Sequence, residues 1–82
     1  MNRQELRKKL DELGVDRAHY SLDGDRSVVG IVLYDSYGTW TIFDVDERGN
    51  SNGETTFTSE EEACHYIYKI FEEEVRTFGP TA

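Results

Sequence analysis

The sequence predicts one α+β domain in the order α-β-β-β-β-α, with a four-stranded antiparallel sheet and both helices packed on one face. Three observations lead to this fold class: leucines at helical spacing near the N-terminus, four short strand-like runs, and a long amphipathic segment near the C-terminus. A chain of 82 residues is long enough for one hydrophobic core. We therefore expect a single domain over residues 1–82, with an ordered core over about residues 3–78.

The first element is a short helix over residues 4–13. Asn2 is placed to cap it, because an asparagine oxygen at this position accepts a hydrogen bond from a free N–H of the first turn. Gly14 stands where a helix end needs a residue with positive φ. One narrow apolar stripe consists of Leu6, Leu10 and Leu13. We expect this stripe to face the core.

Four strands are expected over residues 19–22, 27–34, 39–45 and 54–57. The second run is apolar on both faces, which indicates a central strand, and the third alternates around Trp40. Turn residues occupy 23–25 and 35–38, and residues 46–53 contain no apolar side chain. These connections are too short for parallel crossovers, so the sequence predicts an antiparallel meander.

The last helix has the clearest sequence pattern. Thr58 or Ser59 is the expected N-cap, and Gly79-Pro80 is expected to end the helix. The acidic run Glu60-Glu61-Glu62 lies in the first turn, where negative charge is favourable to the helix dipole. The apolar arc consists of Ala63, Cys64, Ile67, Tyr68, Ile70, Phe71, Val75 and Phe78. An arc of this width predicts a helix packed on the sheet.

The charge is strongly acidic and unevenly distributed. Nine Lys and Arg against 17 Asp and Glu give a net charge of −8, which argues against direct binding to nucleic acid or to an anionic membrane. Residues 1–40 hold six basic and seven acidic side chains, whereas residues 41–82 hold three basic and ten acidic ones. The acidic excess therefore lies in the second half of the chain, which favours a basic protein partner.

The cellular compartment is expected to be the cytoplasm. Cys64 is the one cysteine, so no intramolecular disulfide can form, as is typical of a reducing compartment. The first residues lack the apolar stretch of a signal peptide. The longest apolar run, over residues 28–34, is too short to span a membrane.

No motif predicts catalysis, a metal or a cofactor. The run from Asp44 to Gly49 resembles the start of a calcium-binding EF-hand loop, but Arg48 stands where an oxygen ligand belongs. His19 and His65 have no second ligand nearby. Cys64 lies in the apolar arc, where burial makes a thiol unreactive. We therefore expect a protein that is not an enzyme.

The features that remain belong to the surface. Tyrosine and tryptophan beside acidic residues suit protein recognition, because rings supply buried area and carboxylates supply electrostatic steering. Trp40 is left open between the core and such a contact surface. The predicted partner-binding residues are Asp44, Asp46, Glu47 and Glu54, with Tyr37 and Tyr66 as aromatic anchors.

A series of short motifs carries a family resemblance. In order, they are Tyr20-Ser21-Leu22-x-Gly24, Trp40, Glu47-Arg48-Gly49, and Phe57-Thr58-Ser59-Glu60 running into Ala63-Cys64. This order resembles a family of small immunity proteins of bacterial polymorphic toxin systems, the family numbered fifty-nine among the immunity families. The resemblance covers about residues 20–71.

The resemblance implies an immunity protein. Such a protein binds a cognate toxin domain made beside it and occludes the active site or an adjoining surface, without performing chemistry. It would be a monomer or a weak homodimer, and its acidic surface suits a basic toxin such as a nuclease. Two other classes stay open: an acidic inhibitor that mimics nucleic acid to block a phage or host enzyme, and a self-associating structural module.

Overall fold

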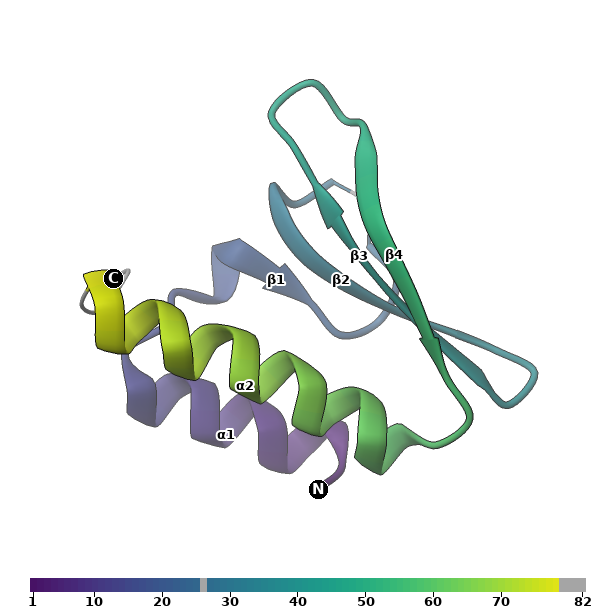
Figure 1. The fold of residues 1–82 in the computed structure, drawn as a ribbon, viewed down its shortest axis with the longest axis horizontal. Helices are drawn as coiled ribbons and strands as arrows, with labels where there is room; N and C mark the ends of the chain where they lie inside the picture. Colours follow the sequence, from purple (N-terminus) through teal and green to yellow (C-terminus); the bar gives the residue numbers. More distant parts are fainter. Residues whose placement is uncertain (26, 79–82) are drawn as a thin grey trace.

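The structure, a computed structural model, describes residues 1–25 and 27–78 and confirms the α+β class. Its elements follow one another along the chain as Figure 1 shows. They are α1 (Arg3–Leu13), the 3₁₀ turn η1 (Arg17–His19), β1 (Tyr20–Ser21), β2 (Gly30–Ser36), β3 (Thr39–Val45), β4 (Ser51–Phe57) and α2 (Glu60–Phe78). None of the helices in these residues combines the length and apolarity needed to cross a bilayer.

The four strands form one sheet in the order β1-β2-β3-β4, but this sheet is mixed. The prediction of a purely antiparallel sheet is wrong at β1, which runs parallel to β2 with Tyr20 opposite Ile31. A parallel pair usually needs a crossover of a dozen or more residues. Here β1 is only two residues long, and β2 begins at Gly30, nine positions after the last residue of β1, so this connection is shorter than a usual crossover.

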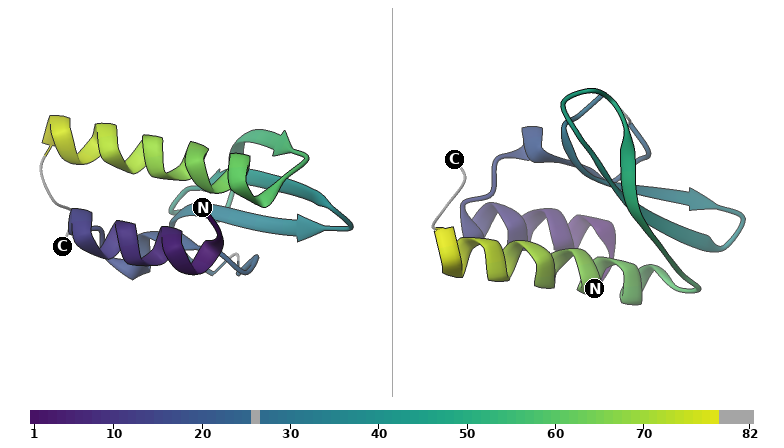
Figure 2. Two further views of the ribbon diagram at one scale, coloured as in Figure 1. Left: turned by 90° about the horizontal axis from the view of Figure 1, so that it is seen from below. Right: turned by 45° about the horizontal axis from the view of Figure 1, so that its top comes forward.

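Both helices lie on the same side of the sheet, and they run parallel to each other, as the views in Figures 1 and 2 agree. The main core fills the space between the helices and the sheet. Leu33 pairs with Ile42 across β2 and β3, and both side chains are buried against the helices. The helices contribute Leu6, Leu10, Ala63, Cys64, Ile67 and Phe71 to this core.

Arg3 ties the starts of the two helices together. Its backbone N–H and its Nε atom both donate to the Glu60 carboxylate, at 3.2 Å each. Its guanidinium also donates to the Leu22 carbonyl and lies 5.3 Å from the centre of the Trp40 ring. Trp40 is partly buried and packs against the main core, so the structure places it with the core.

A second, smaller core lies on the opposite face of the sheet. Val32 pairs with Phe43 across β2 and β3, and both are buried there together with Val45. Val28, from the segment between β1 and β2, packs against them. The expected strand over residues 27–34 therefore begins only at Gly30, because the preceding residues cover this face.

The local predictions at the helix ends are confirmed. Asn2 Oδ1 accepts from the Glu5 N–H at 2.9 Å, Gly14 ends α1, and Ser59 Oγ accepts from the Glu62 N–H at 3.2 Å. The expected helix end at Gly79-Pro80 lies outside the described residues. β4 begins at Ser51 rather than at residue 54, because an irregularity between the pairs at Ile42 and Asp44 lets the polar residues continue the strand.

Candidate functional site

The connection between β3 and β4 is a tight turn built by Asp46. Its Oδ1 atom accepts from the backbone N–H groups of Arg48 and Asn50, at 2.9 Å each. The Asp46 backbone closes the same turn, since its N–H donates to the Asn50 carbonyl and its carbonyl accepts from Gly49. Asp46, predicted as a contact residue, therefore also shapes the hairpin that carries the other acids.

Replacement of Asp46 by alanine is expected to destabilise the protein by about 1–2 kcal/mol, because two backbone donors lose a charged acceptor. Unfolding in urea, followed through the fluorescence of the one tryptophan, measures the loss. Glu47→Ala is the matched control, because Glu47 is the exposed neighbour in the same turn, and it should stay within about 0.5 kcal/mol of wild type. Equal stability of the two variants would contradict this role for Asp46.

Three further acidic residues of the predicted site lie on the β3–β4 hairpin. Asp44 lies near the end of β3, Glu47 in the turn and Glu54 in β4, and all three are exposed. Within residues 1–25 and 27–78, none of their carboxylates makes an ion pair or a hydrogen bond. A shallow hollow of about 480 Å³ beside the turn brings Asp44, Asp46 and Glu47 together on one surface. Arg48 lines the same hollow, and Asp46 is held by the turn, so the unpaired carboxylates of this hairpin are those of Asp44, Glu47 and Glu54.

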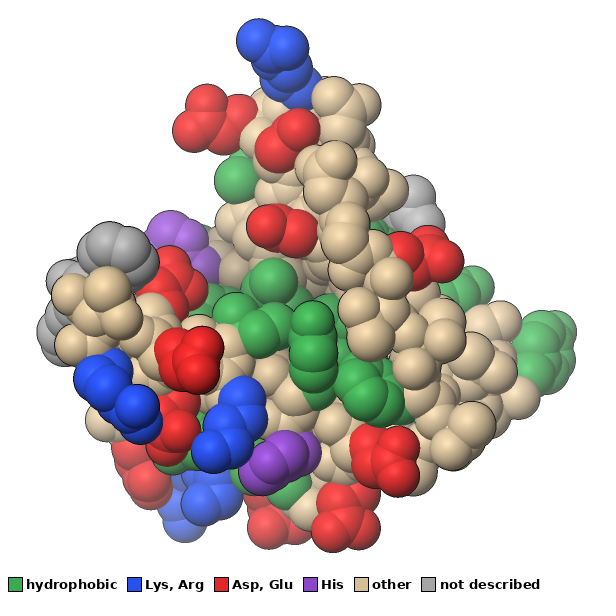
Figure 3. Space-filling view, in the orientation of Figure 1, with side chains coloured by type: hydrophobic (Ala, Val, Ile, Leu, Met, Phe, Trp, Pro, Cys, Tyr) green, Lys and Arg blue, Asp and Glu red, His purple; other side chains and the backbone are tan. Residues whose placement is uncertain are grey.

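A groove lies where α2 diverges from the sheet, and we call it the hairpin groove. It has a volume of about 270 Å³ and is lined by Ile31, Ile42, Phe43, Asp44, Asn52, Gly53, Tyr66 and Ile70. Figure 3 shows apolar side chains between the helix and the projecting hairpin, with acidic side chains around them. The groove brings Asp44 and Tyr66 together, although they are far apart in the sequence.

Tyr66 is the predicted aromatic anchor that this arrangement favours. Its side chain is 37% exposed, and its ring packs against Phe57 with the ring centres 5.3 Å apart. Tyr66 also borders a larger open hollow of about 820 Å³, which Met1, Phe57, His65 and Lys69 help to line. A ring that is fixed on one side and open on the other suits contact with a partner.

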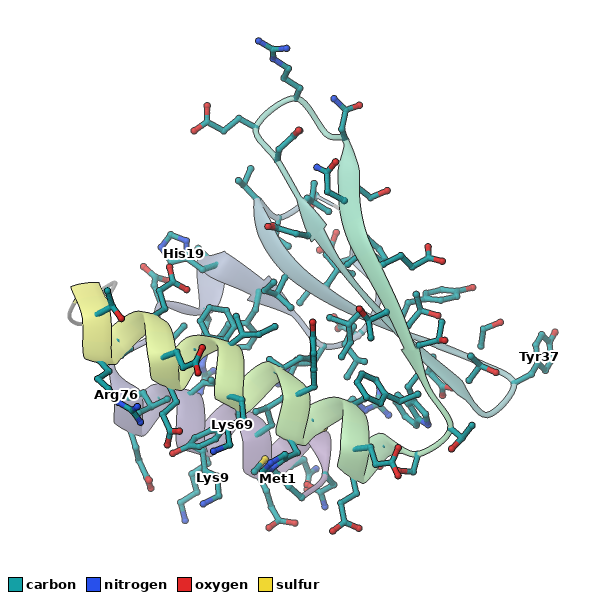
Figure 4. The ribbon with its side chains drawn as sticks, viewed as in Figure 1. Met1, Lys9, His19, Tyr37, Lys69 and Arg76 are labelled. Carbon is teal, nitrogen blue, oxygen red and sulfur yellow. The ribbon has the colours of Figure 1, made fainter. Side chains whose placement is uncertain are left out.

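Tyr37, the other predicted anchor, lies apart from this surface. It is fully exposed in the turn between β2 and β3, and Figure 4 shows it at the far end of the sheet from the β3–β4 turn. β3 separates the two turns, so they are roughly 20 Å apart at about 3.3 Å per residue. The structure therefore brings Asp44, Asp46, Glu47 and Tyr66 to two adjoining hollows that share Asp44. Glu54 lines neither hollow, and Tyr37 is a separate exposed aromatic residue.

Ile31 and Ile70 are groove residues that the sequence analysis did not select for binding. Ile70 follows Tyr66 by four positions, which places both on the same face of α2. That spacing could have indicated a shared surface. Ile31 could not have been found in this way, because its place beside α2 depends on how far the helix lies from the sheet.

Cys64 is fully buried in the main core. Burial raises the pKa of its thiol from 9.0 to about 11, and the Glu60 carboxylate adds to the rise. Within the described ranges, no group of three or more His, Cys, Asp or Glu side chains is arranged to hold a metal. His19 and His65 are both exposed, His19 in η1 and His65 on α2.

The Cys64 thiol is expected to make stability fall as the pH rises. The folded state holds the proton up to about pH 11, whereas the unfolded state releases it near pH 9.0. The contribution of the protonated thiol to the free energy of unfolding is therefore fully present below pH 9.0 and declines between pH 9.0 and about 11. Urea unfolding across this range should show a shallower decline for Cys64→Ala than for wild type. If the free energy of unfolding fell equally with pH in the two proteins, this contribution of the Cys64 thiol would be excluded.

Comparison of the chain with protein-family models, with curated proteins and with solved structures found no match. The resemblance to the immunity family therefore stays a prediction.

Proposed function

We propose that this chain is an immunity protein that binds a basic toxin domain and neutralises it by occlusion in the cytoplasm of the producing cell. One observation carries the proposal: the unpaired carboxylate of Asp44, on the β3–β4 hairpin, and the partly exposed ring of Tyr66 line the same apolar groove. The motif order that resembles the immunity family supports the same class. Neutralisation of this kind needs a stable complex and no catalytic group.

The charge of the hairpin supports fast capture of a basic protein. Asp44, Glu47 and Glu54 project from a hairpin that extends beyond the two helices (Figure 1). The hairpin carries four carboxylates against one cation, Arg48, and a net negative charge raises the rate of association with a basic partner by steering their encounter. A nuclease, whose active site must attract phosphate groups, is a partner of the required sign.

The size of the surface is also sufficient. The protein exposes 5315 Å². A standard interface takes about 800 Å² from each partner, which is roughly 15% of this surface. A protein of this size can therefore supply the area that a complex with one toxin domain needs.

The edge strand β4 favours a foreign partner over a second copy of this chain. β4 pairs only with β3 among the described strands, so its other edge is open. Gly53, with φ of 65°, lies at the irregularity in this strand, and the exposed Glu54 follows it. Irregular geometry and charge at an edge strand both discourage edge-to-edge pairing of identical sheets.

Co-expression with the toxin domain encoded beside this gene tests the proposal. We expect the chain to restore growth and the two purified proteins to form a stoichiometric complex on a sizing column. A toxin that stays fully active when this protein is present in excess would contradict the proposal. Inhibition of unrelated DNA-binding enzymes would instead favour the nucleic-acid mimic.

A further inference from the structure

The hairpin groove has an apolar base between two walls. One wall is formed by Asp44 and Asn52 of the sheet, and the other by Tyr66 and Ile70 of α2. Ile31, the cross-strand partner of Asp44, and Ile42, two positions before Asp44 in β3, lie on the same face of the sheet as Asp44 and supply apolar surface. A volume of about 270 Å³ is at the lower limit of the pockets that hold small molecules and suits a single long side chain.

The described residues that line the groove carry no positive charge, since no lysine, arginine or histidine is among them. Asp44 is exposed, and its carboxylate has no ion pair or hydrogen bond within the described parts of the chain. Glu74 follows Ile70 by one helical turn on the same face of α2, which adds negative charge near the groove.

We propose that the hairpin groove receives the side chain of an arginine presented by a basic protein partner. The methylene groups would lie on Ile31 and Ile70, and the planar guanidinium would stack on the Tyr66 ring while it pairs with the Asp44 carboxylate. Arginine fits better than lysine, because a guanidinium stacks on aromatic rings and pairs in a bidentate manner. This inference rests on the proposed function for the identity of the partner.

Titration of the ¹⁵N-labelled protein with N-acetyl-arginine amide tests the groove without the toxin. We expect saturable chemical-shift changes at the backbone amides of Ile31, Asn52 and Ile70. N-acetyl-citrulline amide, which has a similar shape but no charge, should produce much smaller changes. Equal changes with both compounds, or unsaturable changes spread over all acidic residues, would overturn the proposal.

Variants of the two walls make the test residue-specific. Asp44→Asn and Tyr66→Leu should each weaken arginine-amide binding by about fivefold, which is the size expected for an exposed ion pair or cation–π contact. Tyr66→Phe keeps the ring and should bind like wild type. Glu47→Gln, which removes one charge from the turn outside the groove, is the matched control. A loss with Glu47→Gln as large as that with Asp44→Asn would show that only general charge matters.

The toxin complex provides a second, separable test. If wild-type protein binds the toxin and both groove variants bind it equally well, the arginine inference fails while the proposed function stands. If wild-type protein does not bind the toxin, the proposed function fails, and the arginine-amide titration still decides whether the groove recognises a guanidinium. Double-mutant cycles between Asp44→Asn and each toxin arginine would identify the occupant.

Discussion

Replacement of Gly30 by alanine is expected to cost about 3 kcal/mol or more, which is a large part of the stability of a small domain. Gly30 has φ of 147°, a backbone conformation that residues with a side chain rarely adopt. A Cβ atom at this position would lie 1.9 Å from the His19 carbonyl oxygen. The chain would have to separate β1 from β2, and the pairs that begin with Tyr20 and Ile31 would be lost.

Gly49→Ala is the matched control for this variant. Gly49 also has a positive φ, of 83°, but no atom lies within 4 Å of the position of its added Cβ. Its replacement should cost about 1 kcal/mol, from backbone strain alone. Urea unfolding of the two variants, followed through Trp40 fluorescence, separates strain from steric conflict. Equal urea midpoints for the Gly30→Ala and Gly49→Ala variants would mean that the steric conflict at Gly30 relaxes without loss of stability.

Reversal of Asp44, Glu47 and Glu54 to lysine is expected to slow association with a basic toxin domain by about tenfold or more at low salt. Asp46 is left unchanged, because its carboxylate holds the turn. The difference from wild type should shrink as salt rises, since the screening length falls from about 30 Å at 0.01 M to about 3 Å at 1 M. Stopped-flow association rates over this range measure the effect.

A variant with the same change in net charge elsewhere controls for total charge. Glu12, Asp35 and Glu73 are exposed, and none of them makes an ion pair within the described residues. Their reversal to lysine should slow association much less than reversal of the hairpin acids. Similar rates for the two triple variants would move the contact surface away from the hairpin. Circular dichroism should show that both variants are folded.

Features that depend on residues close together in the sequence could be predicted from the sequence. The caps at Asn2 and Ser59 form because a side-chain oxygen meets an N–H three positions along the chain. The parallel β1 could not be predicted in this way, because it depends on which core each flanking residue joins: Leu22 packs in the main core and Val28 against the second core, on the other face of the sheet. The early start of β4 was missed because its polar residues are typical of a loop.

In the candidate site, too, residues that are close in the sequence could be grouped in advance, whereas residues that only the fold brings together could not. Asp44, Asp46 and Glu47 are close in the sequence and line one hollow. Tyr66 joins Asp44 only because α2 lies beside β3 and β4 and then diverges from the sheet. Tyr37 was grouped with the acids by residue type, yet the length of β3 keeps it at the other end of the sheet.

The ion pair between Arg3 and Glu60, which links the two helices, has a consequence for the order of folding during biosynthesis. These two residues are 57 positions apart, and the helices they join are the first and last elements of the described fold. On the ribosome, α1 therefore emerges long before α2, the element against which Leu6 and Leu10 are buried. The main core can close only after α2 has left the exit tunnel, so the hairpin groove, which Tyr66 and Ile70 of α2 help to line, is completed after, and not during, the translation of this segment.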